Sequence, residues 1–162
     1  MRRFFMTLFF GLLFGAVIGF ALGLFFYPYI FLSDIVATEQ VTNPASRTLV
    51  TTGTFIHANP SDPIHWGKGG VKVYADLVHL QDDFEVGPGP KFHVYLVPEA
   101  NVTTATAVEK TMFVDLGRLK AFKGSQTFPI PVGVDLKNFP HVVIWCEQFN
   151  VLISPAKLEP IR

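Results

Sequence analysis

The chain has 162 residues, 49% of them hydrophobic, and its 13 basic and 13 acidic side chains give no net charge. A chain of this length usually forms one domain, with room for an appendage. The balanced charge does not indicate a nucleic acid or an anionic surface as a partner.

The N-terminal segment predicts a membrane-spanning helix at residues 4–32, which contain no charged side chain. As a helix, residues 4–26 alone would be about 34 Å long at roughly 1.5 Å per residue, enough to cross a hydrocarbon core of about 30 Å. A cleavable signal peptide has a shorter apolar region, of about 7 to 15 residues, followed by small residues. We therefore expect an uncleaved, single-pass anchor in the lipid bilayer of the cell membrane.

The charges that flank this span predict its direction. Arg2 and Arg3 precede it in a short tail, residues 1–3, whereas the first charges after it are Asp34 and Glu39. Positive residues favour the cytoplasmic side of a membrane. The tail is therefore expected in the cytoplasm and the remainder of the chain on the extracytoplasmic side.

Glycine recurs every fourth residue inside the predicted span, at Gly11, Gly15, Gly19 and Gly23. This spacing would place small residues along one stripe, where another helix can approach closely. The stripe is a candidate surface for a helix–helix partner or a homo-oligomer. The alternative is that glycine is simply frequent in membrane helices.

After the span, the composition predicts a polar stalk at residues 33–48 and then a β domain at residues 49–158. Short runs rich in Val, Ile, Phe and Tyr are separated by glycine and proline, as is typical of strands and turns. The helical patterns in this part are weak. We expect an all-β domain, a sandwich or barrel-like structure, outside the membrane.

The run HVVIWCEQFNVLIS, residues 141–154, reads as a strand in which the alternation of apolar residues fails. As one regular strand it would place Glu147 on an apolar face, and an unpaired buried carboxylate is costly. A bulge at residues 146–148 would instead turn Glu147 toward solvent and place Cys146 and Phe149 on the core side. The second interpretation removes the buried charge.

Cys146 is the only cysteine of the chain, so an internal disulfide is impossible. Its thiol must then be a buried hydrophobic group, an intermolecular partner, or a reactive or ligating group. The histidines show no spacing typical of zinc, and no C-x-x-C-H motif for haem attachment occurs. A copper site lacks the histidine or methionine that would follow the cysteine. His93 is either a histidine at the edge of the core or a ligand.

Several short motifs resemble the DM-thirteen domain, which accompanies DOMON domains in Skeletor-like and Knickkopf-like animal proteins and also occurs alone in membrane-anchored bacterial proteins. The similarity covers roughly residues 49–158. Its most specific part is the W-C-x-x-F-x-V ending. The motifs are G-T-F (53–55), L-x-D-D-F (80–84), G-P-x-x-H-V-Y-L (89–96), L-G-R-L-K (116–120), K-G-S-Q (123–126) and V-V-I-W-C-E-Q-F-N-V (142–151).

The resemblance implies extracytoplasmic electron transfer, with the family's cysteine acting as a free thiol or holding a prosthetic group such as haem. Carried to this chain, that role falls on Cys146, and copper is a less favoured cofactor than haem. Trp145 and His93 are candidates for cofactor binding, Trp145 also for an electron relay, and a redox protein is the implied partner. The alternative is a non-catalytic envelope module in which Cys146 only packs the core.

Overall fold

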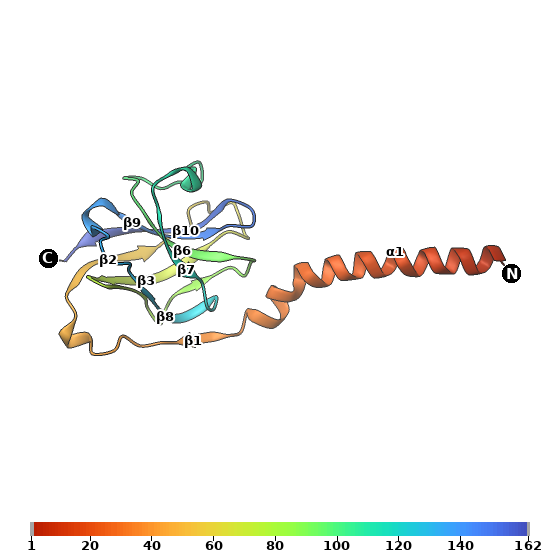
Figure 1. Ribbon diagram of the computed structural model, residues 1–162, viewed down its shortest axis with the longest axis horizontal. Helices are drawn as coiled ribbons and strands as arrows, with labels where there is room; N and C mark the ends of the chain where they lie inside the picture. Colours follow the sequence, from red (N-terminus) through yellow and green to blue (C-terminus); the bar gives the residue numbers. More distant parts are fainter. Residues whose placement is uncertain (1, 162) are drawn as a thin grey trace.

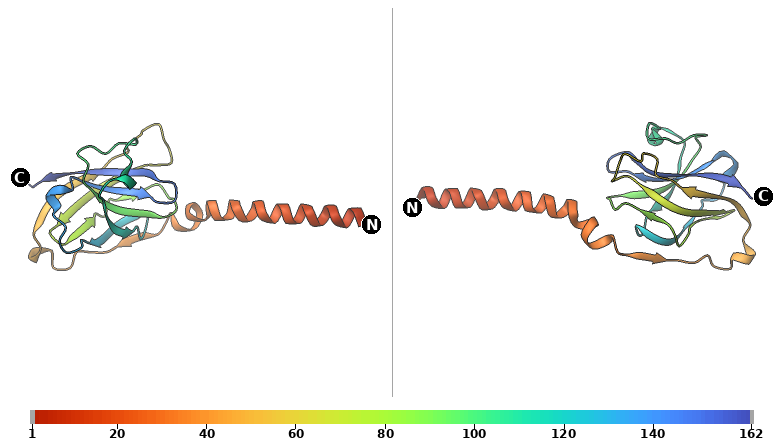
Figure 2. Two further views of the ribbon diagram at one scale, coloured as in Figure 1. Left: turned by 45° about the horizontal axis from the view of Figure 1, so that its top comes forward. Right: turned by 180° about the vertical axis from the view of Figure 1, so that it is seen from behind.

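The computed structural model describes residues 2–161 as one long helix followed by a β domain (Figures 1 and 2). Helix α1, Arg2–Tyr27, continues into one π-helical turn, Pro28–Leu32. Arg2 and Arg3 of the predicted tail form the first turn of α1, and Met1 lies outside the described residues. The helix keeps its α geometry as far as Tyr27, and the next residue, Pro28, lacks a backbone N–H to donate.

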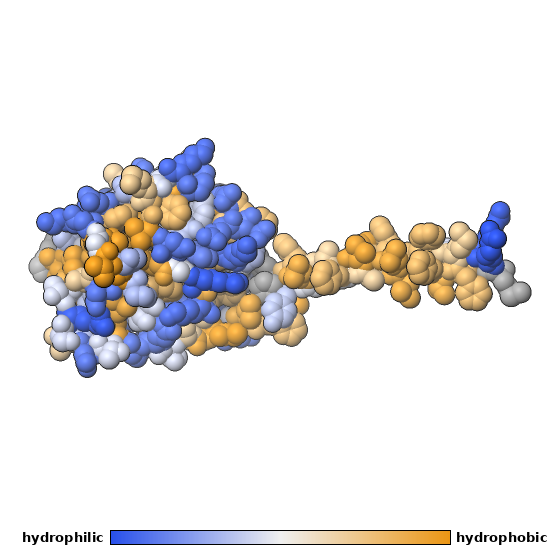
Figure 3. Space-filling model, in the orientation of Figure 1, coloured by the Kyte–Doolittle hydropathy of each residue, from blue (hydrophilic) through white to orange (hydrophobic). Residues whose placement is uncertain are grey.

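Helix α1 projects from the domain with its apolar side chains exposed, as Figure 3 shows. The segment Arg2–Leu32 is long and apolar enough to cross a membrane, as a membrane anchor or a signal sequence would be. The four spaced glycines have open space where a side chain would project. Their role in helix association stays a prediction.

The described part of the domain contains ten strands in a single mixed sheet, which confirms the predicted all-β class. The strands follow in the spatial order β1-β8-β4-β3-β2-β10-β9-β6-β7, and β5 pairs with β3 and β8. All pairs are antiparallel except β1 with β8. The strands are β1 Val36–Thr38, β2 Leu49–Phe55, β3 Gly67–Tyr74, β4 Leu77–Leu80, β5 Glu85–Val86, β6 Phe92–Val97, β7 Val114–Arg118, β8 Lys123–Pro129, β9 His141–Cys146 and β10 Val151–Pro160.

The sheet curls around one apolar core. The main cluster takes buried side chains from strands all along the sheet, among them Val71, Leu80, Phe128 and Ile144. Phe92 of β6 meets Phe122, just before β8, with ring centroids 5.8 Å apart, although β6 and β8 are far apart in the strand order. The inner face therefore forms the closed core of a barrel-like domain.

A second, smaller core lies on the outer face of β6 and β9. It contains Tyr95, Val143 and Trp145, and it is covered by Val102 and Val108 from the long segment between β6 and β7. That segment includes a short 3₁₀ helix, Val108–Lys110. As a result, every residue of β9 is buried, on both faces of the strand.

The segment expected as a polar stalk differs from that expectation, because part of it packs along the domain. Strand β1 pairs in parallel with β8. A short 3₁₀ helix, Pro44–Ser46, follows β1 in the chain. Gly124 opposes Ala37 with φ +85°, and a Cβ on Gly124 would collide with the Ala37 carbonyl. The close approach of the two strands thus depends on glycine in a left-handed conformation.

Glu39 fastens β1 to the domain. Its carboxylate accepts hydrogen bonds from the Lys120 ammonium at 2.7 Å and 2.8 Å, and from the N–H and hydroxyl of Thr127 at 2.8 Å and 2.9 Å. Burial alone would raise the pKa of Glu39, but these bonds together lower it. No sequence pattern indicates this contact, because Lys120 and Thr127 lie far from Glu39 along the chain.

We expect Glu39→Gln to lower the free energy of unfolding of the full-length protein in detergent by about 1–2 kcal/mol, allowing for solvent screening of a partly exposed ion pair. Since the folded-state pKa of Glu39 is lowered, its stabilisation is present above the unfolded pKa near 4.5 and is lost as the pH falls through the folded value. Thermal unfolding from pH 7 to pH 3 measures both effects. Glu159→Gln, at an exposed position of β10, is the control, and an equal loss in both variants would contradict the role of Glu39.

Candidate functional site

The stretch that carries Cys146 is a β-hairpin, which corrects both sequence interpretations. The chain is neither one regular strand nor a strand with a bulge at residues 146–148. Instead, β9 ends at Cys146, a turn occupies residues 147–150, and β10 begins at Val151. Asn150 closes the turn with φ +52°, a conformation that asparagine tolerates well.

The irregularity of pairing lies further on, between Leu152 and Ser154. The hairpin leaves Glu147 exposed, as the bulge interpretation expected, but for a different reason. Phe149, expected on the core side, is 58% exposed because it belongs to the turn. Apolar residues repeat on both arms of the hairpin, and in sequence this repetition resembles a single strand.

The Cys146 thiol is enclosed at the end of β9. The residue is 1% exposed and belongs to the main apolar core. Its S–H donates to the Pro90 carbonyl, with Sγ and O 3.3 Å apart. Burial raises the pKa of Cys146, the backbone amides of Phe149 and Gln148 act in the opposite direction, and the charge of Glu147 adds to the increase. At neutral pH the group is therefore a thiol.

The three residues predicted for redox chemistry and cofactor binding lie on two faces of the sheet. Cys146 is paired with Phe92, and Trp145 is paired with His93. Directly opposed residues in an antiparallel pair project to the same face, and successive residues alternate. The structure thus brings His93 and Trp145 together on the outer face and places Cys146 on the inner face.

The surroundings of Cys146 can be compared with what a bound haem or copper ion would require. A haem would need an open pocket beside the sulfur, but the Cys146 thiol is surrounded by core side chains and a backbone carbonyl. A site shared by Cys146 and His93 would need ligands from opposite faces of one strand pair. Neither group fits the residues in this conformation.

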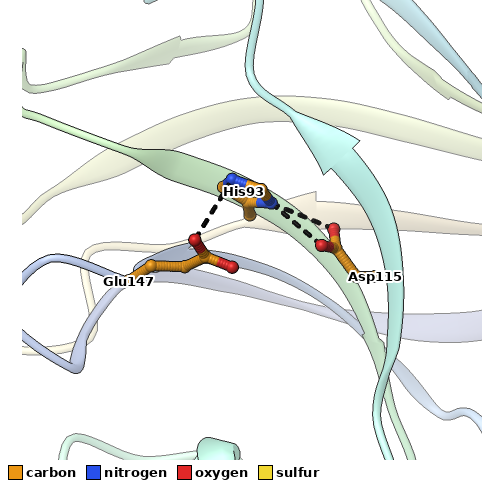
Figure 4. Close-up of side chains that lie close together, drawn as sticks. All are labelled: His93, Asp115 and Glu147. Carbon is orange, nitrogen blue, oxygen red and sulfur yellow. Dashed lines mark hydrogen bonds and ion pairs between the residues drawn. The ribbon is translucent and has the colours of Figure 1, made fainter.

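The outer face carries a cluster that joins His93 of β6, Asp115 of β7 and Glu147 of the hairpin turn (Figure 4). The Nδ1 atom of His93 lies 3.0 Å and 3.1 Å from the two carboxylate oxygens of Asp115. Its Nε2 atom lies 3.4 Å from Oε2 of Glu147. The imidazole ring is thus held between two carboxylates, one at each ring nitrogen.

A β-bulge aims Asp115 at this cluster. The register between β6 and β7 shifts between Val94 and Tyr95, so that Asp115 opposes Tyr95 and Gly117 opposes Val94. Gly117 has φ +119°, and its N–H donates to Oδ1 of Asp115 at 2.8 Å. Bulges commonly re-aim side chains in this way.

Tyr95 extends the cluster into the second core. Its hydroxyl donates to Oε1 of Glu147 at 2.7 Å, and the residue is only 2% exposed. The ring stacks on Phe113, with centroids 4.3 Å apart and planes 19° from parallel. Burial raises the pKa of Tyr95 strongly, and the hydrogen bond to Glu147 and the charges of Glu147 and Asp115 raise it further. The phenol is therefore firmly protonated in the resting protein.

The same cluster is where a metal ion could be held, since one possible ligand atom from each of His93, Asp115 and Glu147 lies within 4.8 Å of the others. However, the two carboxylates face opposite nitrogens of the ring (Figure 4). A neutral imidazole binds a metal ion only through the in-plane lone pair of its unprotonated nitrogen, so one ion held by His93 would lie on the side of a single carboxylate. The geometry suits a hydrogen-bonded acid–base chain better.

Sequence reasoning found His93 but missed Tyr95 and Asp115, and it saw Glu147 only as a misplaced charge. The i, i+2 spacing of His93 and Tyr95 was a usable signal, because such residues share one face of a strand. Asp115 offered no signal, since its position depends on the β6–β7 register and the bulge.

We expect native Cys146 to be alkylated by iodoacetamide at least about a hundredfold more slowly than in the urea-unfolded protein, because the thiol is protonated and must wait for local opening. Timed alkylation of the full-length protein, followed by mass spectrometry, measures the two rates. Ser61→Cys in a Cys146→Ser background supplies an exposed reference thiol. Equal native rates for the two thiols would contradict the enclosed site.

Comparison with known proteins places the sequence of this domain in a family. The profile of the electron transfer DM13 family matches residues 60–158, which is more than half of the chain and covers strands β3 to β9, with Cys146, and all of β10 but its last two residues. No curated protein and no solved structure shows significant similarity to the chain. The chain belongs to the DM13 electron-transfer family.

Proposed function

We propose that this protein is a membrane-anchored electron-transfer module whose β domain lies on the extracytoplasmic side and whose redox-active group is the Cys146 thiol. The supporting observation is the position of that thiol within the DM13 match, at the end of a strand beside an exposed turn. The domain would exchange electrons with a partner redox protein in the same compartment.

The surroundings of Cys146 differ from those of a cysteine that only fills space. Its sulfur has a polar partner in the Pro90 carbonyl, and the amides of Gln148 and Phe149 lower its pKa against the larger effect of burial. These amides belong to the turn at residues 147–150, which is exposed throughout. Opening of this turn would admit a partner while the amides remained able to stabilise a thiolate.

The proposed direction depends on the charges around the helix. Arg2 and Arg3 lie at the start of α1, and Asp34 and Glu39 follow its end. The positive-inside tendency then favours a cytoplasmic N-terminus. In this arrangement β1 and its contact with β8 hold the domain close to the extracytoplasmic surface of the membrane.

The glycine stripe of α1 supports a further part of this proposal, the association of anchors. A Cβ at Gly11, Gly15, Gly19 or Gly23 would meet no other atom within 4 Å, so the stripe presents bare backbone to the surroundings. A second helix, from another copy or from the redox partner, can pack closely against such a stripe.

One observation favours a second function, a structural or binding module of the cell envelope. Cys146 is almost fully buried within the main core, as a cysteine used only for packing would be. In that case its replacement by another small residue changes stability alone.

We expect Cys146→Ser to abolish electron exchange with ferricyanide, a mild one-electron oxidant, by the full-length protein in detergent. Stability should fall by about 1–3 kcal/mol, because a hydroxyl replaces a buried thiol. Spectroscopic titration measures the electron exchange and thermal unfolding measures the stability. Cys146→Ala is the matched control for lost stability without a new polar group. Electron exchange that persists in both variants would contradict the role of Cys146, and the absence of exchange in the unmodified protein would favour the structural alternative.

The proposed orientation predicts that, in right-side-out membrane vesicles, added protease digests the β domain without prior permeabilisation. Positive charge before the span, at Arg2 and Arg3, is the physical reason. Immunoblotting with an antibody to the C-terminal part measures the digestion. Protection in right-side-out vesicles together with digestion in inverted vesicles would show the opposite direction.

A further inference from the structure

We infer that Tyr95 is a second redox site of the domain, which releases one electron to a one-electron acceptor while its phenolic proton moves to Glu147. This inference rests on the proposed electron-transfer function and adds to it a residue on the opposite face of the sheet from Cys146. The acceptor is an oxidised metal centre or radical on a partner.

The first support is the proton acceptor. Oxidation of a phenol makes its proton strongly acidic, and a buried ring that kept the proton would carry an unsolvated positive charge. The hydroxyl of Tyr95 already donates to a carboxylate oxygen of Glu147 at 2.7 Å. A positioned base at this distance can take the proton as the electron leaves.

The second support is an outlet for that proton. Oε2 of Glu147 lies 3.4 Å from Nε2 of His93, and Nδ1 of His93 lies 3.0 Å from Asp115. The Glu147–His93 distance exceeds that of a good hydrogen bond, so a small movement of the exposed Glu147 side chain completes the chain. The side chains of His93, Asp115 and Glu147 are 18%, 39% and 38% exposed, and the series therefore leads from the core to water.

The third support is the aromatic surroundings of the Tyr95 ring, from which the electron would leave. The Tyr95 ring stacks on Phe113, which is half-buried, and packs in one cluster with Trp145, the neighbour of Cys146 in sequence. Tyr95 thus lies in contact with aromatic groups on the route from the surface toward the thiol.

Tyr95 and Cys146 differ in the group that would accept their proton. The S–H of Cys146 donates to a backbone carbonyl, which is not a base, whereas the O–H of Tyr95 donates to a carboxylate. One-electron oxidation is easier when a base next to the oxidised group can accept its proton. In the closed protein, Tyr95 is the better placed of the two groups for that step.

The step balances as follows. The O–H bond of Tyr95 breaks, one electron passes to the acceptor, and the proton forms a new O–H bond on Oε1 of Glu147. The products are a neutral tyrosyl radical, a protonated Glu147 and an acceptor reduced by one electron. When the Glu147 carboxyl group turns to present this proton to Nε2 of His93, its O–H bond breaks and an N–H bond forms on the ring. Glu147 is again a carboxylate, and the resulting imidazolium lies beside the carboxylate of Asp115, which stabilises its charge.

The test uses the full-length protein in detergent with Tyr27, Tyr29 and Tyr74 changed to Phe, so that Tyr95 is the remaining tyrosine. Photogenerated ruthenium(III) tris-bipyridine serves as the one-electron oxidant, and EPR and transient absorption detect the tyrosyl radical. We expect a neutral radical whose formation slows in D₂O. Glu147→Gln keeps an acceptor oxygen but removes the base, and should slow formation roughly a hundredfold, the lower end of what a positioned base contributes.

The matched control retains Tyr74, which is buried on β3, in place of Tyr95. Radical formation as fast in this chain, or an unchanged rate in Glu147→Gln, would overturn the inference. Thermal unfolding checks that each variant is folded, and Glu147→Asp, a base on a shorter side chain, should recover part of the rate. Adding Cys146→Ser should leave the formation rate unchanged, so failure at Tyr95 and failure of the proposed thiol function give different results.

Discussion

The structure depends on the burial of β9 on both faces. Its inner residues pack into the main core, and its outer residues pack under the segment between β6 and β7. Because successive residues of a strand alternate between faces, Trp145 and Cys146 are adjacent in sequence and yet belong to different cores. The domain therefore holds two chemically different environments, one on each side of a single strand pair, β6 with β9.

On the inner side, the Cys146 thiol is neutral and enclosed, and its S–H donates a hydrogen bond to the Pro90 carbonyl. On the outer side, a phenol, two carboxylates and an imidazole form a series that reaches solvent, with hydrogen bonds at both ends and a 3.4 Å contact between Glu147 and His93 in the middle. Burial raises the pKa of both Cys146 and Tyr95, so both groups keep their protons at neutral pH. The difference lies in the proton acceptor, and it decides which group can lose an electron without accumulating charge.

The hairpin turn at residues 147–150 links the two environments. It supplies Glu147 to the outer series, and its amides face the thiol on the inner side. A movement of this exposed turn would therefore change both sites together. Strand β1 adds a mechanical connection, because Glu39 and the β1–β8 pairing tie the segment after the helix to the far side of the same sheet. Helix α1 is thus not separated from the domain by a free linker.

The apolar N-terminal helix, the β class of the domain and the family can all be inferred from the sequence, because hydrophobic length, strand-forming residues and short motifs are local properties. The sequence also identifies Cys146 as a candidate redox or ligand residue and His93 as a candidate ligand. The hairpin at residues 141–154 and the pairing of residues 36–38 with β8 become visible only in the folded domain, since both depend on which strands meet. The association of Tyr95, His93, Asp115 and Glu147 had the same origin: strand register and one bulge bring together side chains from three separate segments, and no local pattern encodes a register.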